Sequence, residues 1–165
     1  MRIRSARSLL MLTEEEELRD LDTGEVQIDF RLLGKRTAEL TDWIRQDSKF
    51  QALPLGYFSS GNGAAAAMFA AADRPGAISA IVSAGGRPDL AGPWIWRVKA
   101  PTLFVLGSRD TVALGFTQSI LTFIPQTVDR RLALIEDAHQ VVEGQETLRK
   151  TAFLARDWFH RYLVN

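Results

Sequence analysis

The chain of 165 residues contains no cysteine and only two histidines, His139 and His160. The absence of cysteine excludes disulfides, thiolate nucleophiles and zinc sites built from cysteine ligands. Two histidines are too few for a histidine-rich metal site, so we expect no metal and no cofactor. Lysine plus arginine equals aspartate plus glutamate, with 20 residues each. This balance leaves no net charge that would favour nucleic acid or an anionic membrane as a partner.

Long hydrophobic runs are also missing, because no apolar stretch approaches the roughly 18 residues that a membrane-spanning helix needs. Arginines precede the apolar stretch Leu9–Leu12, but this stretch is too short for a secretory signal and leads directly into Glu14–Glu17. We therefore predict a cytoplasmic protein. With 46% apolar and 24% charged residues, the composition is that of a globular protein, and the length suits a single domain over residues 1–165.

Short apolar runs alternate with stretches of helical periodicity, which is typical of an α/β fold with a parallel sheet and helices on both faces. Asp29 is a suitable N-cap for a helix through about Gln46, and Trp43 on that helix is interpreted as a core residue. The acidic segment from Glu14 to Thr23 is interpreted as a solvated connector. The predicted strands are 8–12, 52–58, 78–83, 102–107 and 132–135, and the later predicted helices are 63–72, 113–123 and 144–163.

The most informative segment is Ser59–Gly63, which lies between a predicted strand and an alanine-rich helix. A nucleophile elbow places the nucleophile at the centre of a sharp five-residue turn whose first and last residues are small. Only a turn centred on Gly61 has small residues at both positions and a helix directly after it. The sequence therefore predicts an elbow with glycine where a nucleophile is expected.

An acid and a histidine follow later strands. Asp110 comes shortly after the apolar run 102–107, and His139 comes shortly after the run 132–135. Open parallel sheets bind ligands at the carboxyl ends of their strands. We therefore expect Gly61, Asp110 and His139 to share one edge of the sheet, in the chain order elbow, acid, histidine.

From Thr13 onward the chain resembles the dienelactone-hydrolase-like branch of the α/β-hydrolases. The resemblance implies a three-layer sandwich with a mostly parallel sheet, and hydrolysis of an ester or lactone by a Ser-Asp-His triad. The elbow of that branch typically reads Gly-Tyr-Phe-Gly-Ala-Ser-Thr-Gly-Ala; matched without gaps, its nucleophilic serine falls on Gly61, its acid on Asp110 and its histidine on His139. The segments that carry the resemblance are Leu53–Phe58, Gly63–Ala67, Val82–Ala91, Ala100–Gly107 and Ala138–His139.

The resemblance also implies that the backbone N–H of Asn62 helps to hold an oxyanion. Ser59 and Ser60 are alternative nucleophiles, although we favour the interpretation that they are simply small residues in a tight turn. Arg87 follows the Gly85-Gly86 turn. It either locks this loop through local hydrogen bonds or binds a substrate carboxylate, and we favour the structural role.

The family places further strands and a helix ahead of the segment that resembles Ser8–Leu12, and one of those strands leads into half of the oxyanion hole. None of these elements precedes Met1, so we expect a sheet that lacks the family's first strands. Three explanations stay open: the sheet closes the gap, a second chain pairs with the strand Ala52–Phe58, or the sequence is a piece of a longer protein. The second explanation predicts a homo-oligomer through an exposed sheet edge.

Three functions are compatible with these features. The first is a weak or inactive hydrolase, whose substrate, if it is active, is a small ester or lactone. The second is a non-catalytic hydrolase-like binding module. The third is a nucleotide-binding domain, because Gly61-Asn62-Gly63 and Ala66 fit a dinucleotide fingerprint at a helix start. We rank the third lowest because the next strand ends in Ser83–Gly86, without the acid that ribose binding requires.

Overall fold

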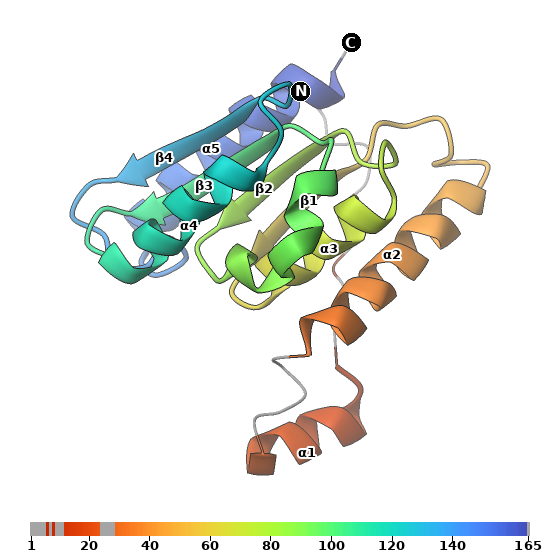
Figure 1. The fold of residues 1–165 in the computed structure, drawn as a ribbon, viewed down its shortest axis with the longest axis horizontal. Coiled ribbons are helices and arrows are strands. Elements are labelled where there is room, and N and C mark those ends of the chain that lie inside the picture. The colour runs from red at the N-terminus through yellow and green to blue at the C-terminus, as the bar shows by residue number, and fades with distance from the viewer. Residues whose placement is uncertain (1–5, 7, 9–11, 24–28, 165) are drawn as a thin grey trace.

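The computed structural model describes residues 6, 8, 12–23 and 29–164. These residues form a four-stranded parallel sheet in the order β1-β2-β3-β4, with helices on both faces (Figure 1). The predicted α/β architecture is confirmed, while the predicted strand 8–12 lies almost entirely outside the described residues. The strands are β1 (Gly56–Ser60), β2 (Ala80–Ala84), β3 (Thr102–Gly107) and β4 (Arg130–Ile135), and the helices are α1 (Glu14–Thr23), α2 (Phe30–Gln46), α3 (Gly63–Asp73), the 3₁₀ segment η1 (Pro88–Arg97), α4 (Thr111–Phe123) and α5 (Gln145–Leu163).

The strands pair in a register that brings their carboxyl ends to one edge. Ser60, the last residue of β1, lies opposite Ala84, the last residue of β2. Gly107 at the end of β3 lies opposite Ile135 at the end of β4. The loops that follow all four strands therefore emerge at the same edge of the sheet, where open parallel sheets place their sites.

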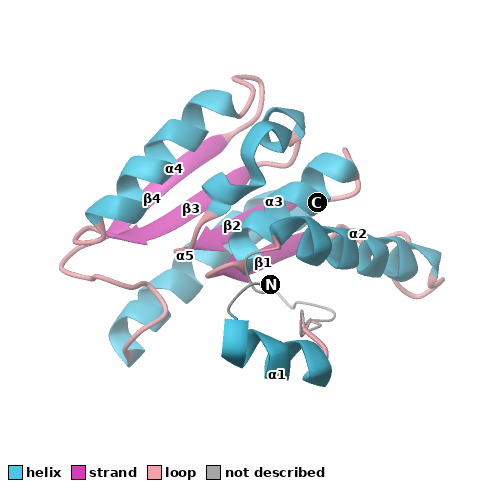
Figure 2. Cartoon of the chain, turned by 60° about the horizontal axis from the view of Figure 1, so that its bottom comes forward, coloured by secondary structure: helices cyan, strands magenta, loops and turns pink. Residues whose placement is uncertain are grey.

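The central strands feed two separate cores. Ile81 and Phe104 are buried on the face that carries α3, η1 and α4. Val82 and Val105, the next residues along, are buried on the other face, against α5. Figure 2 shows the strands between α4 on one side and α5 on the other. Because successive side chains of a strand point to opposite faces and both faces are covered, β2 and β3 are almost entirely apolar, with Ser83 and Thr102 as buried polar exceptions.

Small side chains let α3 pack closely against its neighbours. Ala64–Ala67 and Ala70–Ala72 are all buried, and α3 contacts α2, η1 and the sheet. On α2, a Cβ at Gly34 would lie 2.4 Å from Cδ1 of Phe69, so glycine is needed for this approach. The helix that follows the Gly61 turn is therefore held firmly in the core.

The segment Glu14–Thr23 forms helix α1, so the prediction of a solvated connector is wrong. Thr13 and Glu16 form a capping box: the Glu16 N–H donates to Thr13 Oγ1 at 3.3 Å, and the Thr13 N–H donates to Glu16 Oε2 at 2.9 Å. The glutamates of the first turn also favour the positive end of the helix dipole. These local interactions outweigh the high charge that suggested a connector.

Helix α2 begins as predicted, because the Asp29 side chain accepts a hydrogen bond from the Leu32 N–H at 3.0 Å. The prediction that Trp43 belongs to the core is wrong, since its side chain is 56% exposed. The buried face of α2 instead includes Leu33 and Thr41. Trp43 comes two residues after Thr41, about 200° further around the helix, and so it lies on the face opposite the core.

Candidate active site

Gly61 lies in the tight turn that joins β1 to α3. Its φ is +54°, a left-handed conformation that glycine adopts readily and other residues rarely adopt. A Cβ added to Gly61 would meet no heavy atom within 4 Å, so the turn has room for a side chain. The predicted succession of strand, sharp turn and helix is present, and the turn has the strained backbone that a nucleophile elbow needs.

The loop after β2 contacts the backbone of this turn. The Gly61 carbonyl oxygen accepts hydrogen bonds from the Ala64 N–H at 3.2 Å and from the Arg87 N–H at 3.3 Å. Gly86 has a φ of +86°, and a Cβ there would lie 2.1 Å from the Gly61 carbonyl oxygen. Backbone contacts therefore set the position of the elbow, and they do not depend on which side chain residue 61 carries.

The strand that leads into the elbow is anchored to α2. The hydroxyl groups of Tyr57 and Thr41 share a hydrogen bond at 2.5 Å. Burial raises the pKa of Tyr57 to about 12, although the hydrogen bond to Thr41 acts in the opposite direction. Tyr57 is therefore a neutral, structural group at physiological pH, and it has no acid–base role at the elbow.

The two serines before Gly61 have different surroundings. Ser59 is buried, and its hydroxyl donates to the Val82 carbonyl oxygen at 3.4 Å. Ser60 is exposed, and its side chain makes no hydrogen bond to the described residues. Because neighbouring strand residues point to opposite faces, only Ser60 presents its hydroxyl to solvent. If either serine replaces the missing nucleophile, the geometry favours Ser60.

Asn62 directly precedes α3, and its side chain makes no capping hydrogen bond. The structure also gives its backbone N–H no hydrogen-bond partner among the described residues. A free N–H at a helix start is suited to an anion, because the helix dipole adds partial positive charge there. The predicted oxyanion donor is therefore available for such a contact.

Asp110 is engaged by the helix that follows it. Its side chain caps α4 and accepts a hydrogen bond from the Ala113 N–H at 3.0 Å through Oδ1. Aspartate is among the best N-cap residues, so this contact alone accounts for an acid at this position. The predicted triad acid therefore has a structural role, and any role in orienting a histidine comes in addition.

His139 lies in the exposed loop after β4. The loop crosses the end of β3, because a Cβ at Gly107 would lie 2.2 Å from the Ala138 carbonyl oxygen and 2.8 Å from that of His139. The Ala138 carbonyl oxygen also accepts a hydrogen bond from the Arg109 N–H at 2.9 Å. The backbone thus brings the two loops together, but the described residues show no hydrogen bond between the Asp110 carboxylate and the His139 imidazole.

Further contacts tie the same two loops together. Asp137, with a φ of +60°, accepts a hydrogen bond from Arg109 Nη2 at 2.8 Å. Its N–H donates to Ser108 Oγ at 3.0 Å. Asp137 therefore faces Arg109, and it is not a substitute for Asp110 as the partner of His139.

Arg87 joins the loop after β2 to α4. Its Nε and Nη2 donate to both carboxylate oxygens of Asp89, at distances from 2.7 to 3.1 Å. Its guanidinium carbon also lies 4.1 Å from the centre of the Phe116 ring. The hydrogen bond to Asp89 is the main cause that raises the pKa of Arg87. These contacts support the structural role; binding of a substrate carboxylate stays a prediction.

Nothing in the sequence marks Gly86 or Gly107, the two glycines of these close approaches, as part of a site. The Gly85-Gly86 pair is visible as a turn, and Gly107 is visible as the end of an apolar run. Their contacts with Gly61 and Ala138 bring together residues that are about 25 to 31 positions apart in the chain. Gly86 and Gly107 are therefore positioning residues that only the folded structure identifies.

The carboxyl edge is an open surface on which Gly61 and His139 are both exposed. Two surface depressions lie at the amino ends of β3 and β4, beside Lys99 and Arg130, and neither includes a predicted site residue. The described part of the chain contains no cluster of three or more His, Cys, Asp or Glu placed to hold a metal ion. None of its helices has the length and apolar character to cross a membrane.

Comparison with solved structures identifies the family. A dienelactone hydrolase from Anabaena variabilis is 39% identical to this chain with a TM-score of 0.86, and the match covers 93% of this chain and 70% of that protein. The chain belongs to the dienelactone-hydrolase-like branch of the α/β-hydrolases. The predicted resemblance is thus confirmed, although no protein-family model matches the chain.

Two further solved structures show the same fold. A dienelactone hydrolase-like promiscuous phosphotriesterase from metagenomic libraries is 12% identical with a TM-score of 0.65, and the match covers 89% of this chain and 67% of that protein. A CIB-like hydrolase from Thermoplasma acidophilum is 15% identical with a TM-score of 0.56, over 78% of this chain and 59% of that protein. At these identities the likeness extends to the fold alone.

Curated relatives occur in two strains of Mycobacterium tuberculosis, where they are provisionally named as phosphoribosyl transferases. Each is 39% identical over 153 residues, which is 93% of this chain and 33% of the relative. The chain therefore spans about a third of the length of the curated relatives it matches. Their name refers to a much longer protein than the matched region.

Proposed function

We propose that this member of the dienelactone hydrolase branch has weak or no hydrolytic activity toward esters and lactones, because Gly61 occupies the nucleophile position. The observation that carries this proposal is the elbow itself. Gly61 has the left-handed φ of +54° and open space where a side chain would extend, but it has no oxygen to attack a carbonyl. The backbone is suited to the reaction, while the reacting atom is missing.

The remaining groups would support only part of the family's chemistry. In a working triad, the serine oxygen attacks the carbonyl, histidine moves the proton, and the acid orients and stabilises the histidine. Here the Asn62 N–H would supply one oxyanion donor, while Asp110 also caps α4. Binding and a complete oxyanion hole without the triad leave roughly 10³- to 10⁴-fold acceleration over water. With Asn62 as the one donor argued from this chain, we expect turnover well below that range and close to background.

A non-catalytic binding module is the second candidate. The observation that favours it is that Asp110 caps a helix and that the described residues show no hydrogen bond between its carboxylate and the His139 imidazole. A protein that only binds its ligand does not need a hydrogen bond between the Asp110 carboxylate and the His139 imidazole. The phosphoribosyl transferase name is not transferred to this chain, because the match covers only 33% of that relative.

The test compares hydrolysis of an activated aryl ester by wild type, Gly61→Ser and Gly61→Ser with His139→Ala. We expect wild type to be near background, Gly61→Ser to raise kcat/KM by about 10²-fold, and the double variant to lose this gain. Gly76→Ser is the matched control, because Gly76 also has a left-handed φ, of +88°, and open space around it. It imposes similar backbone strain without supplying a nucleophile at the elbow.

Two outcomes would contradict the proposal. If Gly61→Ser has the circular dichroism and melting behaviour of the control but stays at background, the missing nucleophile is not what limits activity, and the binding module is favoured. If wild type already hydrolyses the ester and loses activity on Ser60→Ala but not on Ser59→Ala, the nucleophile is Ser60. The elbow would then be wrongly centred on Gly61.

A further inference from the structure

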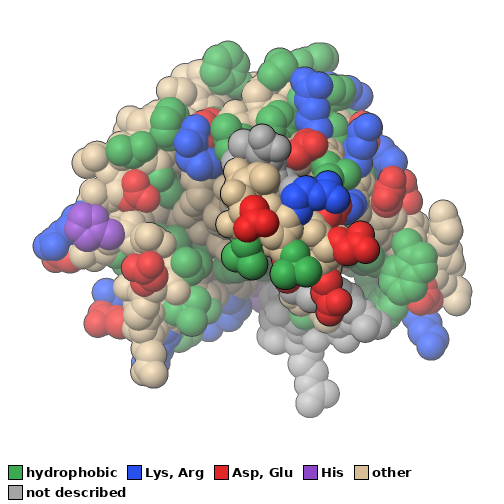
Figure 3. Space-filling model, turned by 90° about the horizontal axis from the view of Figure 1, so that it is seen from below, with side chains coloured by type: hydrophobic (Ala, Val, Ile, Leu, Met, Phe, Trp, Pro, Cys, Tyr) green, Lys and Arg blue, Asp and Glu red, His purple; other side chains and the backbone are tan. Residues whose placement is uncertain are grey.

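One exposed face of helix α1 carries both leucine and glutamate side chains. Leu18 is 67% exposed and Leu21 is 83% exposed. Their spacing of three residues places them on one face of the helix. Glu14 and Glu17 are exposed and lie on the same side by helical spacing. Figure 3, which views the molecule from the side where α1 is nearest, shows hydrophobic groups with acidic groups around them.

The opposite face of α1 is bound to α2. Arg36 donates to both carboxylate oxygens of Glu16, at 2.6 and 2.7 Å. The hydrogen bond from Arg36 is the main cause that lowers the pKa of Glu16 to about 2, so the carboxylate is charged at physiological pH. Figure 1 shows α1 standing clear of the sheet and of α5. The contact with α2 therefore leaves the leucines directed away from the body of the molecule.

A groove at the amino ends of β3 and β4 has the complementary character. Trp96 is 64% exposed there, so the groove offers a large apolar surface. Arg97 and Lys99 add positive charge, and neither has an ion-pair partner among the described residues. We call this surface the Trp96 groove; the residues that matter here are Pro75, Trp96, Arg97, Lys99, Pro125 and Val128.

We propose that the Trp96 groove of one copy receives α1 of a second copy of this chain. Leu18 and Leu21 would pack on the apolar floor, and the glutamates would face Arg97 and Lys99. The charges are complementary, because the outward face of α1 is acidic and the groove holds two cations without acidic partners. This inference is independent of the proposed function, since the groove lies at the opposite edge of the sheet from Gly61.

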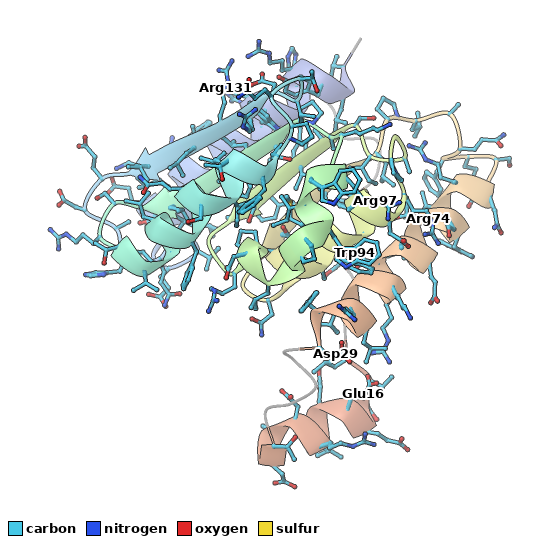
Figure 4. The ribbon with its side chains drawn as sticks, in the orientation of Figure 1. Glu16, Asp29, Arg74, Trp94, Arg97 and Arg131 are labelled. Atoms are coloured by element: carbon cyan, nitrogen blue, oxygen red, sulfur yellow. The ribbon has the colours of Figure 1, made fainter. Side chains whose placement is uncertain are left out.

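A second copy is favoured over contact within one chain. In Figure 4, Glu16 lies on α1 at the lower end of the molecule, while Arg97 beside the groove lies higher up, on the body. The Arg36–Glu16 ion pair joins α1 to α2, and neither residue lines the groove. When two copies exchange α1 reciprocally about a two-fold axis, each helix occupies the other copy's groove, and the dimer is closed.

Cysteine cross-linking tests the contact directly, because the chain has no cysteine of its own. A chain with Leu21→Cys is mixed with a chain with Thr127→Cys, since Thr127 also lines the groove. Mild oxidation should give a mixed disulfide dimer. The control pair, Leu21→Cys with Gln140→Cys, should cross-link far less, because Gln140 lies beyond the carboxyl end of β4.

Sedimentation velocity at two ionic strengths then measures how strongly two copies associate. Leu21→Ala should weaken association about tenfold, because a buried leucine is replaced by a smaller side chain. Lys99→Glu should weaken it about threefold at low salt, and adding Glu17→Lys should restore it. Arg149→Glu on α5 makes the same change in charge away from the groove, and it should have no effect.

Three results would overturn the proposal. One is a chain that stays monomeric at every concentration up to its solubility limit. Another is association that Leu21→Ala does not change. The third is equal cross-linking of the test and control cysteine pairs, which would indicate random collision. The ester assay on Gly61 variants is unaffected by any of these results, so failure of this proposal is distinguishable from failure of the proposed function.

Discussion

The two halves of the candidate site, the elbow and the acid–histidine pair, share one kind of backbone packing but differ in their side chains. At the elbow, Gly86 lies against Gly61 so closely that a Cβ would be 2.1 Å from its carbonyl oxygen. At the other half, Gly107 lies equally close to Ala138, with a Cβ 2.2 Å from that carbonyl oxygen. Both pairs of loops are therefore joined through backbone.

The side chains of the two halves do not follow the same pattern. Residue 61, the proposed nucleophile position, is glycine, while Asp110 and His139 are both present but show no hydrogen bond to each other among the described residues. Backbone packing alone therefore positions these loops, without contacts from catalytic side chains. Catalysis needs those side chains within hydrogen-bond reach as well, and loop position alone does not supply this.

Gly86→Ala should have the largest effect on stability. The added Cβ meets the Gly61 backbone, and the φ of +86° disfavours any side chain, so we expect a loss of about 3 kcal/mol in the free energy of unfolding. Urea denaturation measures it. Gly76→Ala is the matched control, because its φ is +88° and no heavy atom lies within 4 Å of the added Cβ. It should cost only about 1 kcal/mol. Equal losses at the two positions would show that contact with the elbow contributes nothing.

Gly107→Ala should have an intermediate effect. The clash with the Ala138 carbonyl oxygen should cost about 2 kcal/mol, without the added penalty of a left-handed φ. Gly115→Ala on α4, where a Cβ has open space, should instead stabilise by up to about 1 kcal/mol. In the Gly61→Ser background, Gly107→Ala should also lower ester turnover, because it moves the loop that carries His139. If Gly107→Ala leaves the stability unchanged, the loop that contains Ala138 moves aside at no cost, and the close contact contributes nothing.

Substitutions of Asp110 should have the smallest effect on stability and separate its two possible roles. Asp110→Ala removes the cap of α4 and should cost about 1 kcal/mol, while Asp110→Asn keeps a good cap and should cost almost nothing. In the Gly61→Ser background, we expect Asp110→Asn to lower kcat at least about tenfold, because an amide does not stabilise a charged histidine. Full activity of that double variant would make Asp110 a helix cap only.

Much of the fold was predictable from local patterns. Strand β3 spans Thr102–Gly107 as predicted, because a proline precedes it and a polar loop follows an uninterrupted apolar run. Strand β1 begins at Gly56 instead of Ala52, since an apolar sequence does not reveal where pairing with β2 starts. The capping box of Thr13 and Glu16 is visible in the sequence of α1, but the four glutamates favoured the wrong prediction of a solvated connector.

The sequence by itself determined the alternation of strands and helices, the sharp turn at Gly61 and the cap at Asp29, because each depends on residues within a few positions of one another. Only the tertiary structure decided that Gly86 supports the elbow and that the His139 loop crosses the end of β3. It also decided that Trp43 is exposed, and that Asp110 caps α4 without a hydrogen bond to His139 among the described residues. The physical reason is that these outcomes depend on how loops and helices far apart in sequence meet across the sheet, and on which of several nearby partners a carboxylate bonds.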